Sequence, residues 1–143
     1  MVVSHLTFYD LDFWVRFEDD HVTSISFEKI ENASDGLYKE EFEKFFKNQP
    51  HQLKLKIEGG TPFQRQVWKA LLEIPYAQSC SYQQIANRIG HPKAVRAVGS
   101  AIGKNPIPIL IPCHRVIKKN GQLGNYTGGT HIKKRLLEVE KNE

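Results

Sequence analysis

The sequence predicts an α/β N-terminal domain, made of a small antiparallel sheet and a helix, followed by a mainly α C-terminal domain that contains a helix-turn-helix. Two observations carry this prediction. Apolar residues alternate with polar ones through residues 1–30, whereas helical spacing of apolar residues dominates after residue 61. Gly59-Gly60 separates the two patterns, so we expect domains at 1–59 and 60–143.

The N-terminal elements are predicted from the spacing of apolar side chains. Residues 11–17 carry an apolar side chain at every second position, which predicts a strand with one buried face. A polar turn at 18–20 leads to a second strand at 22–27. Helical spacing then predicts a helix within 35–47, and alternation returns at 53–57 as a further strand.

Two capping signals begin the first helices of the C-terminal half. The segments from Thr61 to Gln64 and from Ser81 to Gln84 both fit the capping box, in which a hydroxyl residue and a Gln bond each other's backbone. A turn at 90–92 then leads to a third helix, which apolar residues mark over 94–102. Two short helices joined by such a turn are typical of a helix-turn-helix.

The exposed face of this third helix is unusually bare. It is formed by Arg96, Gly99, Ser100 and Gly103. Glycine inside a helix costs about 1 kcal/mol relative to alanine, so two glycines on one face indicate a purpose. Close approach to a DNA backbone, with Arg96 projecting, is one purpose, and tight helix–helix packing is the other.

Residues 105–116 combine three prolines with a strongly apolar run. Proline excludes a helix or a central strand, so we expect an extended, rigid segment buried in the core. Asn120-Gly121 then predicts a hairpin between 116–118 and 122–125. A last helix is expected from Thr130, with an inner side formed by Ile132, Leu136 and Val139.

The net charge of +4 is unevenly distributed. Residues 1–60 contain 7 Lys or Arg against 12 Asp or Glu, a net of −5, whereas residues 61–143 contain 13 against 4, a net of +9. A basic second half favours a polyanionic partner such as nucleic acid, and a solvated basic surface is the alternative.

Other classes of protein are disfavoured. No apolar run approaches the roughly 18–20 residues of a membrane span, and the N-terminus lacks a signal-peptide pattern. We therefore expect no membrane partner and a reducing compartment, the cytoplasm or, in a eukaryote, the nucleus. Cys80 and Cys113 are too few for a disulfide scaffold or a Cys-rich zinc site, so no metal is expected. A monomer is the default, since the sequence carries no signal of oligomerisation.

Cys113 lies between the proline-stiffened run and His114-Arg115. Apolar surroundings raise the pKa of a cysteine and make it inert, whereas a neighbouring His or Arg favours the reactive thiolate. Neighbouring side chains in extended backbone point apart, so contact with His114 needs a bend or a bridging water. A Cys–His nucleophile and a structural cysteine beside a surface histidine both stay open at this point.

A histidine that takes a thiol proton needs an acceptor on its other nitrogen. Carboxylates are scarce in the second half of the chain, where they comprise Glu73, Glu138, Glu140 and Glu143. A glutamate on the last helix is therefore a reasonable partner for His114.

Six short motifs follow one another after residue 60. They are Phe63–Trp68, Ser81–Ala86, Pro92–Val98, Asn105–Pro108, Ile111–Val116 and Gly124–Gly129. The sequence Ile-Pro-Cys-His-Arg-Val at 111–116 resembles the active-site signature of the O6-alkylguanine-DNA alkyltransferases, and the other motifs resemble further motifs of that family in its order. The resemblance covers about residues 61–140, while the N-terminal half matches only in size and outline.

This resemblance implies a fold and an activity. The fold is a ribonuclease H-like N-terminal domain followed by a winged-helix-like C-terminal domain. The activity is DNA repair by single-turnover transfer of an alkyl group from O6-alkylguanine, and from O4-alkylthymine, in double-stranded DNA to Cys113, with no cofactor. Some family members hold zinc near the N-terminus on Cys and His, but here no cysteine precedes Cys80.

The resemblance also implies catalytic roles. Cys113 is the alkyl acceptor, His114 takes its proton through a water, and Glu140 holds His114. Asn105 ties the active-site turn to the recognition helix. Tyr82 crowds the flanking phosphate, helps to rotate the base out, and donates a hydrogen bond to the guanine ring.

The remaining implied roles concern DNA and base binding. Arg96 fills the gap that the flipped nucleotide leaves, and the carbonyls of Cys113 and Val116 accept hydrogen bonds from the guanine amino group. Tyr126 and the backbone of Thr127 frame the base and its O6. A non-catalytic lesion-binding or regulatory module and a Cys–His hydrolase are the rival interpretations.

Overall fold

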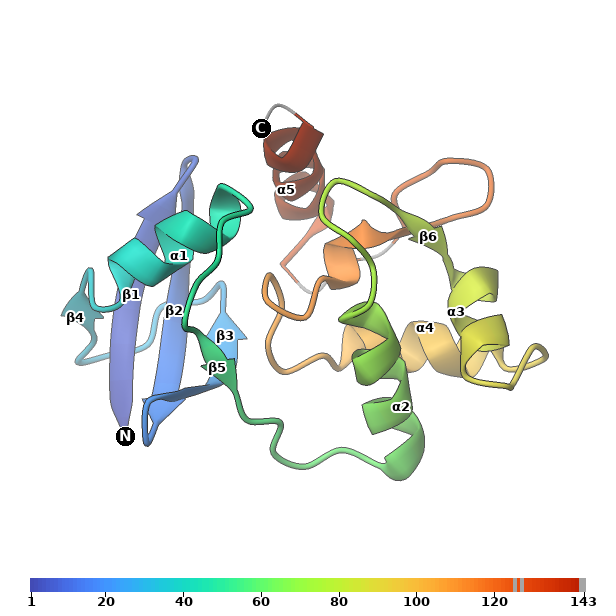
Figure 1. Ribbon diagram of the computed structural model, residues 1–143, viewed down its shortest axis with the longest axis horizontal. Coiled ribbons are helices and arrows are strands. Elements are labelled where there is room, and N and C mark those ends of the chain that lie inside the picture. The colour runs from blue at the N-terminus through green and yellow to red at the C-terminus, as the bar shows by residue number, and fades with distance from the viewer. Residues whose placement is uncertain (125, 127, 142–143) are drawn as a thin grey trace.

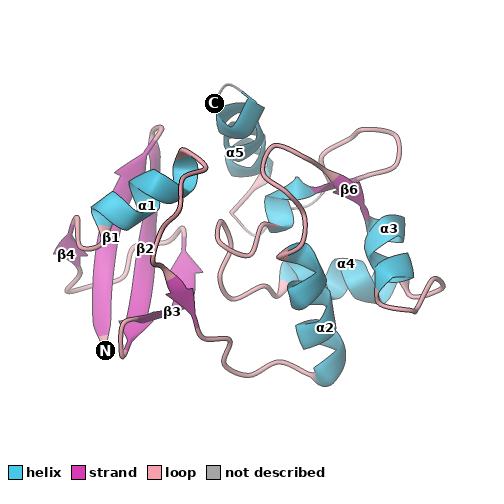
Figure 2. Cartoon of the chain, in the orientation of Figure 1, coloured by secondary structure: helices cyan, strands magenta, loops and turns pink. Residues whose placement is uncertain are grey.

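The computed structural model describes residues 1–124, 126 and 128–141. Figure 1 shows a sheet with one covering helix on one side, a group of helices on the other, and the last helix between them. Figure 2 shows that most of the strand structure belongs to the N-terminal side. The strands of that sheet lie in the order β4 (Ser34–Asp35), β1 (Val2–Phe8), β2 (Leu11–Glu18), β3 (His21–Ser26) and β5 (Lys54–Leu55).

The three long strands pair antiparallel through two tight turns. Tyr9-Asp10 and Asp19-Asp20 join them, and all four residues have positive φ, between 49° and 66°. This is the backbone of the two-residue turns that match strand twist. The predicted alternation in β2 is confirmed, because Phe13, Val15 and Phe17 are all buried.

Helix α1 (Lys39–Phe46) covers the buried face of this sheet. The ring of Phe13 on β2 packs against those of Phe42 and Phe46, with ring centroids 5.5 and 6.2 Å apart. The predicted helix within 35–47 is present but starts only at Lys39, because Tyr38 before it has a left-handed conformation with a φ of 66°.

The prediction of a purely antiparallel sheet is wrong at both edges. β4 pairs parallel with β1, and β5 pairs parallel with β3. Helix α1 lies between β3 and β5 along the chain, and a connection that crosses over through a helix produces parallel neighbours. β4 reaches β1 only after the chain has passed through β2 and β3. Each edge strand has only two residues, which is too short for a pattern to reveal its pairing direction.

The second half begins with three helices, α2 (Pro62–Leu71), α3 (Tyr82–Arg88) and α4 (Val95–Gly103). Both predicted capping boxes are confirmed, with Thr61 and Ser81 as the capping residues of α2 and α3. The indole Nε1 of Trp68 on α2 donates to the carbonyl of Ala101 on α4 at 2.8 Å, which fixes these two helices together.

The proline-rich segment is buried as predicted, but it is not extended. The N–H of Ile111 bonds to the carbonyl of Ile107 at 2.9 Å, and Ile109 has a φ of 77°. A 3₁₀ turn, η1 (Cys113–Arg115), follows at Pro112. Proline excludes long helices and central strands but is compatible with tight turns, so the segment coils inside the core.

The predicted hairpin is only partly formed. The N–H of Lys118 bonds to the carbonyl of Gln122 at 2.8 Å around the Asn120-Gly121 turn, but β7 (Val116–Ile117) pairs with β6 (Cys80–Ser81) in parallel. Asn125, at the predicted end of the hairpin, lies outside the described residues. The last helix, α5 (Thr130–Lys141), begins at the predicted residue and buries Ile132, Leu136 and Val139.

The two halves are joined by a few specific hydrogen bonds. The N–H of Ile25 on β3 donates to the carbonyl of Pro106 at 3.0 Å, and the guanidinium of Arg135 on α5 donates to the carbonyl of Tyr9 at 3.1 Å.

In the described part of the chain, no helix has the length and apolar character needed to cross a membrane. The boundary at Gly59-Gly60 stays a prediction.

Candidate active site

A pocket of about 360 Å³ lies against α3 and α4. The described residues that line it are Tyr82, Gly99, Ile102, Gly103, Cys113, Lys118 and Tyr126. Five of these seven residues were singled out from the sequence, although they come from segments spread over 45 positions between Tyr82 and Tyr126. The fold therefore gathers the candidate nucleophile, the bare helix face and both candidate tyrosines around one cavity.

Cys113 is held at the base of this pocket by the buried amide of Asn105. Asn105 follows α4 and donates through Nδ2 to the carbonyl of Ile111 at 2.8 Å, while its Oδ1 accepts from the N–H of Ile107 at 2.9 Å. Burial raises the pKa of the Cys113 thiol to about 11, against the opposing effects of a hydrogen bond from Asn105 and the charge of Lys133. The resting cysteine is therefore a thiol, which needs a base to become a nucleophile.

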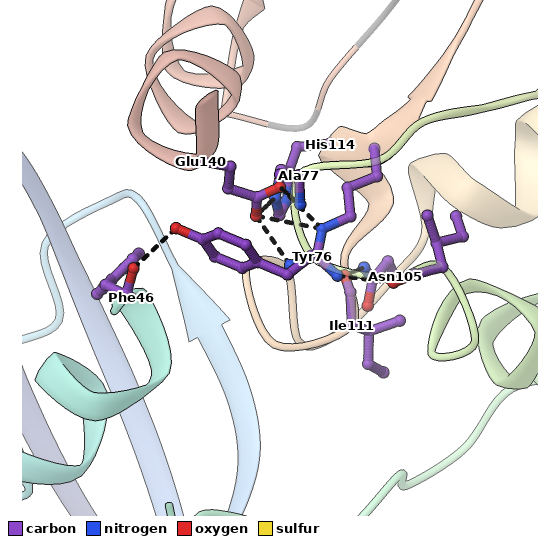
Figure 3. A network of polar contacts seen from close by, with 9 residues as sticks. Phe46, Tyr76, Ala77, Asn105, Ile111, His114 and Glu140 are labelled. Atoms are coloured by element: carbon purple, nitrogen blue, oxygen red, sulfur yellow. Dashed lines mark hydrogen bonds and ion pairs between the residues drawn. The ribbon is translucent and has the colours of Figure 1, made fainter. Parts of the chain in front are cut away.

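His114 and Glu140 form a buried pair beside Cys113. The Nε2 atom of His114 lies 2.7 Å from Oε2 of Glu140, and both side chains are buried. Arg115 donates to the same carboxylate through Nε and Nη2, at 3.0 and 2.9 Å, and through Nη1 to the carbonyl of Ile74 at 2.8 Å. The N–H of Ala77 completes the set at 3.2 Å from Oε1. Figure 3 shows these groups converging on Glu140.

These contacts determine which nitrogen of His114 carries a proton. Burial alone would raise the pKa of Glu140, but the hydrogen bonds from His114 and Arg115 hold it at about 2. The carboxylate is therefore ionised and can only accept, so Nε2 of His114 is the donor. Burial lowers the pKa of His114, so the ring is neutral and its Nδ1 is an acceptor. That Nδ1 is buried and has no hydrogen-bond partner among the described residues.

Lys133 was not singled out from the sequence, yet it lies fully buried beside this site. Its Nζ donates to the carbonyl of Val116 at 2.6 Å and lies 6.0 Å from the centre of the Tyr82 ring. Burial lowers the pKa of Lys133 to about 8, and the attraction of a charged Cys113 opposes that fall. An ammonium group in this position stabilises a thiolate at Cys113.

The two pocket tyrosines differ in their surroundings. Tyr82 begins α3, and burial followed by the charge of Cys113 raises its pKa. The hydroxyl of Tyr126 is buried and, apart from the sulfur of Cys113, has no hydrogen-bond partner among the described residues. Burial, and after it the charge of nearby Cys113, raise the pKa of Tyr126 well above its ordinary value. Both phenols therefore stay protonated and can donate a hydrogen bond to a molecule in the pocket.

Arg96 and Ser100 lie on α4 but do not line the pocket; both are exposed. Gly99 and Gly103 do line it. Among the described residues, no atom lies within 4 Å of the place where a Cβ atom on Gly103 would stand, so no described helix packs tightly against this glycine. Thr127 lies outside the described residues.

Arg115 and Lys133 are the site residues that sequence reasoning missed. Arg115 lies within the motif at 111–116, where the predicted site roles fall on Cys113, His114 and the carbonyl of Val116. Lys133 and Glu140 lie seven residues apart, and therefore on one face of α5, together with its buried apolar residues. Two charged residues on the predicted inner face of a helix indicate a buried polar site. Cys80 is a free, buried cysteine in β6. The described residues contain no cluster of three or more His, Cys, Asp or Glu that could hold a metal ion.

Comparison with known proteins gives a family for most of the C-terminal half. A family model described as "6-O-methylguanine DNA methyltransferase, DNA binding domain" matches residues 62–142. The inducible methylated-DNA–protein-cysteine methyltransferase of Bacillus subtilis is 60% identical over 83 residues, which cover 58% of this chain and 46% of that protein. The match therefore spans less than half the length of that relative.

Longer matches include the N-terminal half. The methylated-DNA–protein-cysteine methyltransferase of Methanosarcina barkeri is 44% identical over 126 residues, covering 80% of this chain and 78% of the relative. The crystal structure of Mycobacterium tuberculosis OGT in complex with DNA superposes with a TM-score of 0.86 at 34% identity, covering 99% of this chain and 94% of that one. The whole arrangement of sheet and helices is thus shared with a structure that contains DNA.

Proposed function

Since this chain belongs to the family of methylated-DNA–protein-cysteine methyltransferases, we propose that it repairs double-stranded DNA by moving the alkyl group of O6-alkylguanine, and of O4-alkylthymine, onto Cys113 once per molecule. The observation that carries this proposal is the buried His114–Glu140 pair next to a buried thiol. A structural cysteine has no need of a neutral histidine with a free acceptor nitrogen.

The chemistry follows from the protonation states. Because a pKa of about 11 keeps Cys113 protonated at rest, its proton has to move to Nδ1 of His114, directly or through a water, before the sulfur can react. Its Sγ then bonds to the alkyl carbon while the bond from that carbon to O6 of guanine breaks. Guanine leaves with the electron pair and is protonated, so the net proton transfer runs from Cys113 through His114 to the base. The product is a thioether, which neither water nor a reductant readily cleaves, so one turnover results.

Three further residues support this step. The negative charge of Glu140 favours the imidazolium that His114 becomes, as the acidic member of a catalytic triad does. The ammonium of Lys133 faces the thiolate and fixes the Val116 carbonyl, one of the two carbonyls that would accept from the guanine amino group. The hydroxyl of Tyr82 would donate to the guanine ring as it leaves.

The base reaches the pocket by leaving the helix. Extrusion of a base from DNA costs a few kcal/mol, which a side-chain wedge and contacts in the minor groove offset. Helices α3 and α4 serve as a helix-turn-helix, with the bare face of α4 against the minor groove and Arg96 as the wedge. Readout in that groove is nearly independent of sequence, which suits a protein that searches all DNA.

The pocket would then hold the extruded base. A volume of about 360 Å³ falls within the range of small-molecule sites, roughly 300–1,000 Å³. Tyr126 lines the pocket beside Cys113, and together with the backbone of Thr127 it would frame the base and its O6. Asn105, between α4 and the active-site turn, would keep the DNA-binding helix and Cys113 in register.

The finer features of the architecture belong to the same proposal. The N-terminal half serves as a ribonuclease H-like support domain over 1–59, and the remainder serves as a winged-helix-like DNA-binding and alkyltransferase domain over 60–143. The protein acts as a monomer, without a cofactor or metal, in the cytoplasm or the nucleus.

Substitution of Cys113 by alanine tests the proposal against its rivals. We expect the wild type to remove methyl groups from a methylated duplex in an amount equal to the protein added, and Cys113→Ala to remove none while its DNA affinity is largely kept. A lesion-binding module predicts no removal by either protein. A Cys–His hydrolase predicts removal that continues beyond one equivalent.

A further inference from the structure

We propose that Phe27, which directly follows β3, is a positioning residue for the reaction, because it holds Tyr126 against the substrate pocket. The inference rests on the proposed function and deepens it, by giving the N-terminal half a direct part in shaping the active site. Phe27 itself does not line the pocket.

Phe27 contacts this loop at two places. Its ring packs against that of Tyr126, with ring centroids 5.9 Å apart and the planes at 52°. The backbone at Gly128 lies so close that a Cβ atom there would be 2.6 Å from Cδ2 of Phe27 and 2.9 Å from Cδ1 of Ile132. Only a residue without a side chain permits this approach, so the loop is confined between Phe27 and α5.

Strand β3, which immediately precedes Phe27, is also bonded to the segment that supports Cys113. The N–H of Ile25, two residues earlier, donates to the carbonyl of Pro106 at 3.0 Å. Pro106 follows Asn105, whose amide holds the turn that leads to Cys113. One end of β3 is therefore fixed to the segment that supports the nucleophile and, through Phe27, to the loop that supports Tyr126.

This arrangement sets the distance between Tyr126 and Cys113. The Tyr126 hydroxyl is buried beside the sulfur, and it has no other hydrogen-bond partner among the described residues. The position of its ring therefore depends on packing, to which Phe27 contributes from outside the pocket. A displacement of a substrate-positioning group by about 1 Å costs about 100-fold in rate.

Labelling of Cys113 by free O6-benzylguanine tests the proposal, since this reaction needs neither DNA binding nor base extrusion. We expect Phe27→Ala to lower the rate constant at saturating substrate by about 100-fold. Phe27→Leu should recover part of that loss, and affinity for unmodified duplex DNA should be unchanged.

Phe8→Ala is the matched control. Phe8 packs on Phe13 and Phe46 within the N-terminal half, and it does not line the pocket. Its substitution should reduce the resistance to urea about as much as Phe27→Ala does, but leave the labelling rate within about threefold of the wild type. Equal labelling rates for the two alanine variants would overturn the proposal.

A second substitution tests the contact itself. Gly128→Ala places a methyl group against the Phe27 ring, so it should slow labelling strongly in the wild type. It should slow labelling much less in a Phe27→Ala protein, where the closer obstacle is gone and only the flexible end of the Ile132 side chain has to move. Losses that simply multiply would refute the contact. A wild type that removes no methyl group from methylated duplex DNA would refute the proposed function, whereas normal labelling by Phe27→Ala refutes only the role of Phe27.

Discussion

Replacement of Lys133 by methionine should raise the free energy of unfolding at neutral pH and lower it at high pH. Burial lowers the pKa of Lys133 from an ordinary 10.5 to about 8. One pKa unit corresponds to about 1.4 kcal/mol, so the charged Lys133 destabilises the folded state by about 3 kcal/mol. Methionine keeps the apolar stem and removes this cost.

The substitution also removes the hydrogen bond from Lys133 to the carbonyl of Val116. A buried acceptor left without a partner costs about 1–3 kcal/mol. At pH 7 the two effects oppose each other, so Lys133→Met should have a free energy of unfolding about 0–2 kcal/mol higher than the wild type.

The balance changes with pH. Below pH 8, Lys133 is charged in both states and its full desolvation cost is present. As the pH rises from 8 to 10.5, the folded protein releases the proton before the unfolded chain does, so the cost disappears and the wild type gains stability relative to the variant. At pH 10 about 1 kcal/mol of the cost remains, because the unfolded chain still holds most of this proton, so Lys133→Met should be less stable than the wild type by about 0–2 kcal/mol.

Activity should move the other way at pH 7. A nearby positive charge favours a thiolate by roughly 1–3 pKa units, so losing it should slow labelling by O6-benzylguanine at least about tenfold. Urea denaturation at pH 7 and pH 10 with labelling at pH 7 measures both effects. A stability difference that is the same at both pH values, or an unchanged labelling rate, would refute the reasoning.

Three other substitutions or conditions test separate parts of the account. Arg96→Ala should slow repair of duplex DNA far more than labelling by free O6-benzylguanine, because only the duplex needs base extrusion; equal losses would exclude the wedge role. Arg115→Leu removes one partner of a buried ion pair with Glu140 and should cost about 3–5 kcal/mol in urea denaturation, against almost nothing for exposed Arg88→Ala. Because burial lowers the pKa of His114 below its ordinary 6.5, the labelling rate should stay constant from pH 7.5 to 6.5 and fall only in more acidic buffer, and a fall centred above pH 6.5 would contradict a buried, neutral base.

The features of the fold that the sequence predicts are those set by local interactions. Both capping boxes join residues three apart, so Thr61 and Ser81 mark the starts of α2 and α3 without knowledge of the rest of the chain. The alternation of apolar and polar residues in β2 is also a local feature, because successive side chains of a strand point to opposite faces and only one face of this sheet is covered.

The features that could not be predicted depend on distant partners. The direction of β4 and β5 is set by the strands that they meet, and two residues carry no pattern. The turn at Ile109, with a φ of 77°, is a conformation that β-branched residues avoid, and only the surrounding core selects it. Burial of Lys133 likewise depends on Val116 and Cys113, which lie far from it in sequence.

The candidate site shows the same division. Cys113 and His114 are adjacent and were assigned together, whereas the Arg115–Glu140 contact joins residues 25 positions apart. The scarcity of carboxylates in the second half of the chain limits the partner of His114 to four glutamates. The packing of α5 against η1 brings Glu140 to within 2.7 Å of His114.

The most direct measurement is the intact mass of the wild-type protein after exposure to excess duplex DNA containing O6-methylguanine, followed by peptide mapping. The account predicts that every folded molecule gains the mass of one methyl group, that the group lies on the sulfur of Cys113, and that a second exposure adds nothing. An unchanged mass after the methyl groups have disappeared from the DNA, or a methyl group on any other residue, would contradict it.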